Sequence, residues 1–357
     1  MQGPVKRHPH RSRNLLAASL WLLMLVGCQQ QGPEAHYSDY LDRLGRTLSV
    51  EVPVIEDATL PRLPRLPRPG QLRLQISATS LDTLDFLALR GCAVQATIGK
   101  RNSSLGRLAR DSQRLLLELE YLQLAPQCIA DLRAREQTAL ADTLQQAWLA
   151  KRQQLPALIF NATLGGAEYR ALWQVPPTPG DYPGGTSSQV ISALEAINGH
   201  TRRWLSDDYC ADNRAFDILL SEIAAGDGGA LWQALARQGR WLAAADLILA
   251  QRMAQGPLCS PGIRPAAADI LPNVVRKVFI GQIQPRAAAL GRRRHELVPA
   301  IAALEDLLAS ALAPDYSAWR GQRQIQLSQL AAAPRQHVEQ LKRILAPCMG
   351  PRMALGR

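Results

Sequence analysis

The sequence predicts an all-α protein, a multi-helix bundle of about ten helices that can divide into two packed sub-bundles. Leu and Ala account for 108 of the 357 residues, whereas Val and Ile account for 30 and aromatic residues for 5%. Straight-chain and small side chains favour helices, and strands prefer β-branched and aromatic side chains. A content of 47% hydrophobic and 20% charged residues excludes a mainly disordered chain.

The amino terminus has the parts of a bacterial lipoprotein signal. An apolar stretch of about 11 residues at 15–25 is too short to span a bilayer but typical of a secretory signal. It ends in Leu25-Val26-Gly27-Cys28, which resembles a lipobox, where a thiol accepts the lipid. We therefore expect residues 1–27 to be a signal peptide and Cys28 to be lipidated. The basic residues before the apolar stretch are Lys6, Arg7, Arg11 and Arg13.

Lipidation at Cys28 would make residues 28–35 a tether at a membrane. Three acyl chains exceed the two-signal threshold for stable anchoring. Gln29 follows the cysteine where an Asp would retain the protein in the inner membrane. The expected location is therefore the periplasmic face of the bacterial outer membrane, with membrane contact through the lipid.

Basic charge is concentrated in the carboxy-terminal third. Residues 260–357 hold 14 basic and 6 acidic groups, whereas residues 28–259 hold 23 and 24. Nucleic acid is not an expected partner of an exported protein, so an anionic lipid or another envelope polyanion is one interpretation. A solvated basic face is the interpretation that we favour.

The first elements after the tether are a helix and a proline-rich strap. Apolar residues at helical spacing predict a helix over about 36–48. Residues 53–69 follow and contain Leu-Pro-Arg three times at 60–68. Proline at every third residue matches the polyproline II turn. We interpret this segment as a stiff strap across the helical body; an exposed recognition strip is the alternative.

Prolines and glycines divide the rest of the chain into helices. Helices over 108–124 and 128–154 are expected to end before Pro126 and Pro156. The loop at 174–188 is the best candidate for a sub-boundary within a helical domain that spans 36–350 and precedes a tail at 351–357. Other helices are expected from about 80 to 98, with Thr79 or Ser80 as cap, and at about 188–205, 211–225, 230–253, 285–297, 299–312, 315–332 and 334–346.

Arg101-Asn102-Ser103-Ser104 is the most suggestive polar cluster. An arginine and an amide beside two hydroxyls fit an anion or a glycan, particularly where a helix begins. The alternative is a helix connection whose Asn and Ser side chains satisfy free backbone groups. We favour the alternative.

The sequence contains no catalytic or metal-binding signature. Histidines are not spaced as ligands on one helix, and no nucleophile elbow or phosphate-binding loop is present. Glu118 and Glu120, expected on the polar side of their helix, are two positions apart and do not form an acid–base pair. We therefore expect no cofactor, no metal and a non-catalytic interaction or assembly module in the periplasm. The alternative is an envelope enzyme or binding protein that acts on a glycan or lipid through a cleft near Arg101 and Asn102.

Several segments resemble a bacterial lipoprotein family, catalogued as domain of unknown function 3080. The resemblance spans nearly the whole mature chain and is most specific at 101–106 and 281–285. It implies a location and a domain extent but no activity. The segments are 40–44, the Leu-Pro-Arg strap, 85–92, 101–106, 278–285, and His337 with Cys348-Met349-Gly350.

Five cysteines remain after the lipidated one. None has Cys-x-x-Cys spacing, and exported proteins form disulfides, so two structural disulfides and one free thiol are expected. We expect Cys92–Cys128, which joins neighbouring helices. For Cys259 the resemblance implies Cys348 as partner and Cys210 as the free thiol. Because Cys210 and Cys259 flank a predicted antiparallel helix pair, Cys210–Cys259 remains the alternative.

Overall fold

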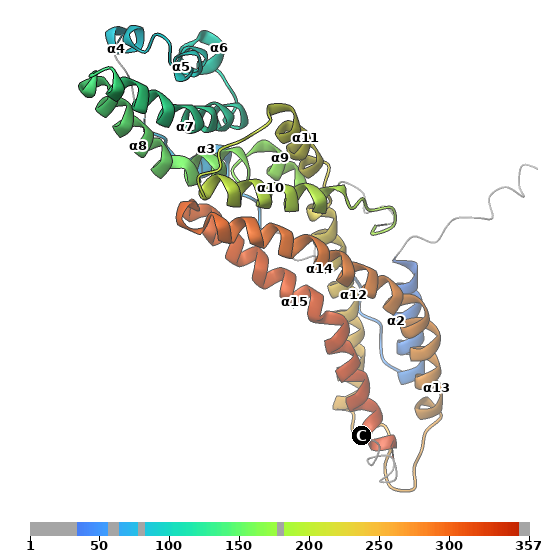
Figure 1. Cartoon of the computed structure of the whole chain (residues 1–357). Helices are drawn as coiled ribbons and strands as arrows, with labels where there is room; N and C mark the ends of the chain where they lie inside the picture. Colours follow the sequence, from blue (N-terminus) through green and yellow to red (C-terminus); the bar gives the residue numbers. More distant parts are fainter. Residues whose placement is uncertain (1–33, 56–63, 78–82, 177–181, 350–357) are drawn as a thin grey trace, which may run out of the picture.

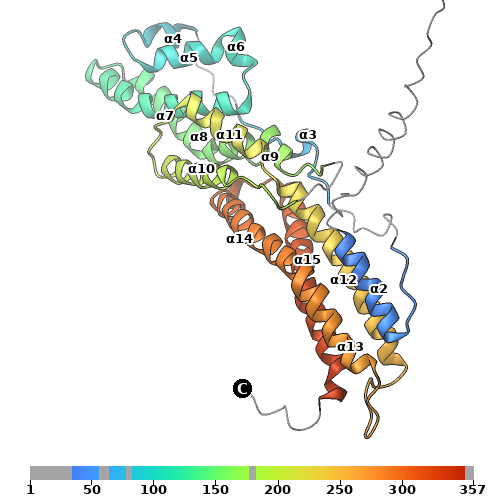
Figure 2. The ribbon, with the colours of Figure 1, turned by 90° about the vertical axis from the view of Figure 1, so that its right-hand side faces the viewer.

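A computed structural model describes residues 34–55, 64–77, 83–176 and 182–349 (Figure 1). Within these four ranges the regular elements are helices and no strand is present, which confirms the predicted all-α class. The helices form an elongated body, with residues 83–107 at one end and residues 267–274 at the other (Figures 1 and 2). No helix in the same ranges has the length and hydropathy needed to cross a bilayer.

The first end is a helical hairpin covered by short helices. Apolar side chains of the hairpin form a core with Leu89, Val94 and Ile98 of the cover. The helix predicted over 80–98 is wrong as a single element, because Gly91 adopts φ +90° and separates two helices. The hairpin is α7 (Asp111–Ala134) and α8 (Thr138–Ala162), and the cover is α4 (Thr83–Ala88), α5 (Val94–Asn102) and α6 (Ser104–Arg107).

The middle of the molecule holds the largest core. Its short helices are α9 (Ala167–Leu172), α10 (Gln189–Leu205) and α11 (Asn213–Ala224). The indole rings of Trp173, Trp232 and Trp319 meet edge to face there, with centroids 5.5–6.5 Å apart. Residues before and after the loop at 174–188 pack together in this core.

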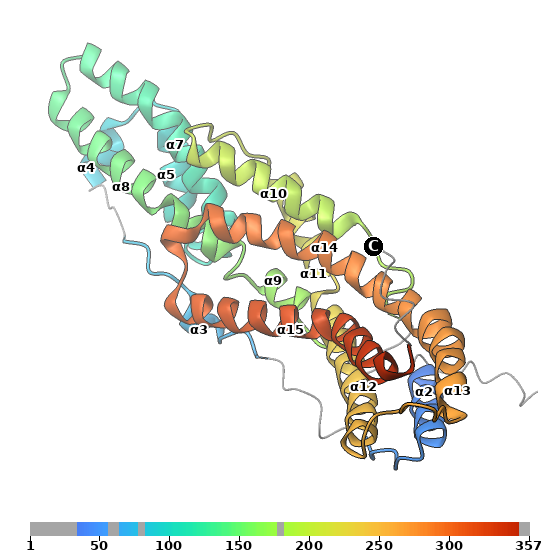
Figure 3. The ribbon, with the colours of Figure 1, turned by 90° about the horizontal axis from the view of Figure 1, so that it is seen from below.

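Long helices extend from the middle of the molecule to its second end. The predicted first helix is α2 (Ala35–Leu48), which lies along α12 (Gly228–Ala254) (Figure 2). Helix α10 lies along α14 (Gln284–Leu307) (Figure 3). The remaining elements are α13 (Ala267–Val274), a π-helix η3 (Val275–Ile283), α15 (Pro314–Leu345) and two 3₁₀ turns, Ala309–Ala311 and Ala346–Cys348.

The expectation that prolines end the long helices is wrong. Helices α7, α8, α14 and α15 continue through Pro126, Pro156, Pro299 and Pro334. A proline lacks the N–H that would bond the carbonyl four residues earlier. At Pro126 that carbonyl belongs to Leu122, and the indole Nε1 of Trp148 donates to it at 3.0 Å. A side chain of the neighbouring helix thus replaces the missing backbone donor.

The described parts of the proline-rich segment lie against the helical body. Trp319 Nε1 donates to the carbonyl of Pro64 at 3.0 Å, and Arg170 donates to the carbonyl of Leu66 at 3.3 Å. Leu66 packs against the middle core. These contacts are those of a strap. The segment then forms the short helix α3 (Pro69–Leu72), and residues 56–63, with the first four residues of the Leu-Pro-Arg repeat, lie outside the described residues.

One disulfide lies at each end of the body. Cys92–Cys128 joins the cover to α7, and Cys259–Cys348 joins the loop after α12 to the end of α15, while Cys210 is free and exposed. The alternative Cys210–Cys259 pair is absent because α11 and α12 do not pack as the predicted antiparallel pair. Helix α11 packs against α9 and α10, whereas α12 packs against α15 and α2 and extends about 40 Å before the loop that holds Cys259.

Candidate functional site

The predicted ligand segment forms the end of α5 and the α6 turn. Ser103 caps α6, because its Oγ accepts from the Gly106 N–H at 3.0 Å and donates to the Lys100 carbonyl at 2.7 Å. Ser104 is exposed and starts the turn. Ser103 therefore has the connecting role that we favoured, whereas Arg101 and Asn102 line a cavity.

Gly106 lets the α6 turn approach α5 closely. A Cβ atom at this position would overlap the carbonyl oxygens of Lys100 and Arg101. Only glycine fits such backbone contact without displacement. Gly106 and the Ser103 cap together hold the turn at the edge of the cavity.

The cavity has a volume of about 930 Å³ and lies between α5, α6, α7, α8 and the segment 73–76. We call it the Arg101 cavity. This size suits a small-molecule ligand. Its polar lining is Arg73, Gln75, Thr97, Arg101, Asn102, Arg107, Asp111, Arg114, Glu118, Tyr121, Thr143, Gln146, Lys151 and Asn161, and its apolar lining is Leu74, Ile76, Ile98, Leu117, Ala147, Ala150 and Leu158.

A buried carboxylate in the wall holds two cations. Arg101 Nε lies 2.6 Å from Glu118 Oε1, and Lys151 Nζ forms an ion pair with Glu118 Oε2. Glu118 and Lys151 are each 5% exposed. The Lys151 ammonium also lies over the Tyr121 ring, 4.9 Å from its centroid.

The buried pair shifts the proton affinities of its neighbours. Burial lowers the pKa of Lys151, the carboxylate of Glu118 opposes that shift, and the charge of Arg101 adds to it. Burial and the Glu118 charge raise the pKa of Tyr121 above its usual range. The Glu118 carboxylate therefore stabilises the charged form of Lys151 against the effect of burial.

The lining of the Arg101 cavity has an excess of positive charge. Five basic side chains and two carboxylates line it, and Asp111 is paired with Arg73 at 2.8 Å. Arg107 and Arg114 have no carboxylate partner among the described residues; Arg114 Nη2 donates only to the Arg107 carbonyl, at 3.0 Å. Two guanidinium groups thus remain for an external anion.

The segment 73–76 is fixed as a wall by a side-chain amide. Asn161 of α8 accepts from the Leu74 N–H at 2.8 Å and donates to the Leu74 carbonyl at 2.9 Å. This pair of bonds imitates a strand ladder. Thr97, 2% exposed, also lines the cavity, and its hydroxyl has no hydrogen-bond partner within the described ranges.

Sequence reasoning placed Arg101 and Asn102 at the site but missed their partners. It expected Glu118 on a polar face, yet this side chain is buried while Glu120 pairs with Lys100 nearer the surface. The partner that accounts for the burial of Glu118 is Lys151, 33 residues away on α8. The available signal was Lys151-Arg152, the two charged residues of α8 after Asp142.

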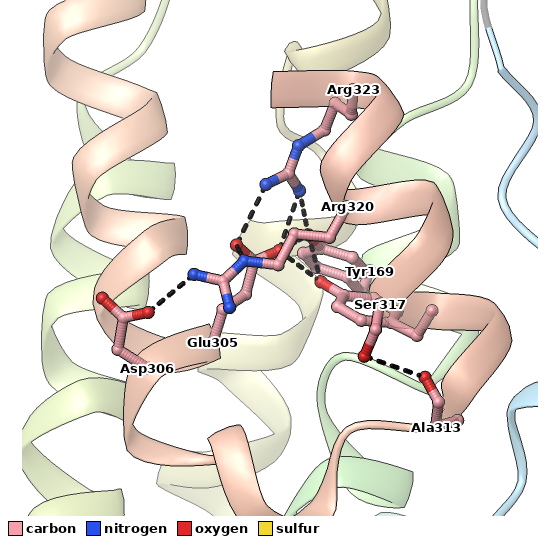
Figure 4. A network of polar contacts seen from close by, with 8 residues as sticks. Tyr169, Glu305, Asp306, Ala313, Ser317, Arg320 and Arg323 are labelled. Atoms are coloured by element: carbon pink, nitrogen blue, oxygen red, sulfur yellow. Dashed lines mark hydrogen bonds and ion pairs between the residues drawn. The ribbon is translucent and has the colours of Figure 1, made fainter. Parts of the chain in front are cut away.

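Two other polar clusters are buried too deeply to serve as sites. Glu305 accepts two bonds from Arg323, at 2.9 and 3.0 Å, and one from Tyr316, at 2.6 Å (Figure 4). Arg323 and Glu305 are at most 1% exposed. This cluster joins α14 to α15 and α9.

The second cluster resembles a catalytic triad in its contacts only. His337 Nε2 lies 2.8 Å from the Tyr40 hydroxyl, and Nδ1 lies 2.6 Å from Asp246. Tyr40 and His337 are at most 1% exposed. Because a substrate cannot reach them, the cluster is a tie between α2, α12 and α15.

Some predicted features lie outside the described residues. Cys28, the predicted lipidation residue, falls in the undescribed part. No group of three metal-binding side chains occurs in the part of the chain that the structure describes.

No curated protein and no solved structure matches the chain. One family model, described as protein of unknown function (DUF3080), matches residues 37–350, and the chain therefore belongs to that family.

Proposed function

We propose that this protein is a lipid-anchored protein of the bacterial envelope that binds an anionic ligand in the Arg101 cavity without transforming it. The observation that carries the proposal is the excess of basic side chains in a cavity of ligand size. Guanidinium groups pair with carboxylates and phosphates through two parallel hydrogen bonds. Arg107 and Arg114 are the groups with which we expect the anion to pair.

Two features favour binding over catalysis. Each oxygen of Glu118 is held by a cation, so this carboxylate is already paired within the wall. The Ser103 hydroxyl is committed to the α6 turn, and Asp111 is paired with Arg73. An enzyme acting on a glycan or lipid at this place would need one of these groups to be free. The proposal thus keeps the non-catalytic character of the favoured prediction and takes from the alternative a binding protein with its cleft near Arg101 and Asn102.

The anchor and the envelope location rest on the lipobox at 25–28, and two disulfides are compatible with a compartment outside the cytoplasm. We expect Cys28→Ala to abolish palmitate labelling and outer-membrane fractionation. Cys210→Ser is the matched control, because Cys210 is a free exposed thiol. Full labelling of the Cys28 variant would contradict the anchor.

Ligand binding is tested by thermal unfolding of the purified lipoprotein in detergent at matched ionic strength. We expect inorganic phosphate, pyrophosphate or citrate to raise the melting temperature and glucose to leave it unchanged. Arg107→Gln with Arg114→Gln should weaken that effect by about tenfold in apparent Kd or more. Arg214→Gln, an exposed arginine on α11, is the control. Equal stabilisation of the double variant and the control would contradict the proposal.

A further inference from the structure

The α6 turn presents two leucines to solvent at the edge of the Arg101 cavity. Leu105 is 84% exposed and Leu108 is 85% exposed. They are three positions apart and lie on the same side of the turn. Gly106 and Arg107, between them, line the cavity. No residue of α6 is buried, so the turn adds nothing to the core.

Basic residues flank these leucines in the sequence. Residues 100–114 contain five basic groups and one acid. The side chains of Lys100 and Arg110 are 57% and 71% exposed, and Arg107 is exposed as well. Exposed apolar side chains flanked by basic groups are typical of protein segments that lie at an anionic lipid surface.

We propose that the α6 turn docks on an anionic phospholipid bilayer and that the ligand of the Arg101 cavity is the phosphate head group of one of its lipids. This inference rests on the proposed function. Leu105 and Leu108 enter the bilayer interface, and Lys100 and Arg110 contact its negative surface. Arg107 and Arg114 receive the phosphate of a lipid whose chains stay in the bilayer.

The arrangement explains why the turn is built as it is. Gly106 and the Ser103 cap hold α6 against α5 without using an apolar side chain of the turn. The apolar side chains of the turn are therefore free to face outward, next to the guanidinium of Arg107. Burying these leucines would instead stabilise the fold, because it would remove apolar surface from water.

The test measures the environment of residue 108 in the full-length lipoprotein held in vesicles by its own anchor. Leu108→Cys in a Cys210→Ser background is labelled with the solvent-sensitive dye NBD. We expect emission that is blue-shifted and several-fold brighter in vesicles that contain phosphatidylglycerol than in phosphatidylcholine vesicles. Ile325→Cys, 61% exposed on α15, is the matched control and should show no difference.

Two variants separate this inference from the proposed function. Leu105→Ser should weaken the lipid response of the 108 label and leave the phosphate-induced rise in melting temperature unchanged. Arg107→Gln with Arg114→Gln should weaken both. An identical spectrum of the 108 label in the two kinds of vesicle, with phosphate binding intact, overturns the docking and leaves the proposed function standing. A lipid response without any anion-induced stabilisation overturns the proposed function and the head-group assignment.

Discussion

Glu118 is the residue on which the wall of the Arg101 cavity depends. Removing its charge leaves Lys151 buried without a carboxylate, whereas removing Lys151 leaves Glu118 still paired with Arg101. Breaking a buried pair so that one charge is left unpaired costs about 3 kcal/mol or more. We therefore expect Glu118→Gln to lower the free energy of unfolding by about 3 kcal/mol, and Lys151→Met to lower it by about 1 kcal/mol, in urea titrations.

The cost of Glu118→Gln should also depend on pH. Burial lowers the pKa of Lys151 in the folded protein, and the loss of Glu118 removes the group that opposes this shift. Between the lowered pKa and the ordinary value, the unfolded chain binds more protons than the folded one, so stability rises with pH. The variant should thus recover part of its lost stability as the pH rises from the lowered pKa of Lys151 toward the ordinary lysine value of about 10.4. A constant deficit, or a larger loss for Lys151→Met, would contradict this assignment.

Among single residues, the sequence predicted those whose contacts lie within their own segment. It missed those whose partners lie on another helix. The hydroxyl of Ser103 caps a turn within its own segment, and such contacts follow from neighbours in sequence. The burial of Glu118 follows from Lys151, and the wall at Leu74 follows from Asn161, 87 residues away. These pairings are set by how α7 and α8 pack, which a single sequence does not specify.

Helix α7 passes through Pro126 because α8 supplies the missing donor. Trp148→Phe removes the bond to the Leu122 carbonyl and should cost about 1–2 kcal/mol of unfolding free energy. In a Pro126→Ala background the new N–H of residue 126 bonds the same carbonyl, so the cost of Trp148→Phe should fall by about 1 kcal/mol. A double-mutant cycle by urea denaturation measures this coupling, and strictly additive costs would show that the indole does not compensate for the proline.

The helices differ in how well the sequence predicted them. Apolar spacing located α2, α10, α11 and α12, because amphipathic helices record their buried face in the sequence. Proline did not mark a helix end where the residues before and after it both pack against neighbouring helices. The π-helix at 275–283 was not predicted; it ends next to Pro285, where the Gln284 N–H bonds the Phe279 carbonyl five residues earlier. Buried Phe279, against Tyr40 and His337, accounts for retaining this geometry.

At the scale of the whole molecule, three cores follow one another along an elongated body. The middle core contains the Trp cluster and the Glu305 network, and each end core contains a disulfide. Long helices shared between cores, such as α12 and α15, couple them. We therefore expect the described body to unfold as a unit. Ionisation of a side chain in one core then lowers the free energy of unfolding of the whole described body.

Tyrosine is the residue type that couples pH to this unit. The chain has seven tyrosines, and the folded protein raises the pKa of each one, mainly through burial. For Tyr37 and Tyr209 the pKa rises to about 12. In the unfolded chain a tyrosine ionises near pH 10. The folded protein thus binds more protons than the unfolded chain above that pH.

The sign of this linkage predicts a steep alkaline transition. Stability is fully present below about pH 10 and is lost as the pH rises toward the folded pKa values, at up to about 1.4 kcal/mol per tyrosine and pH unit. Seven tyrosines together remove up to roughly 10 kcal/mol per pH unit, which is comparable with the whole stability of a typical domain. We expect tyrosinate absorbance to stay low near pH 10 and to rise between about pH 11 and 12 together with the loss of helical circular dichroism. Tyr209→Phe should make the transition shallower and move it to higher pH. Several tyrosines ionising near pH 10 while the helical signal is intact would show that their hydroxyls are not protected by the fold.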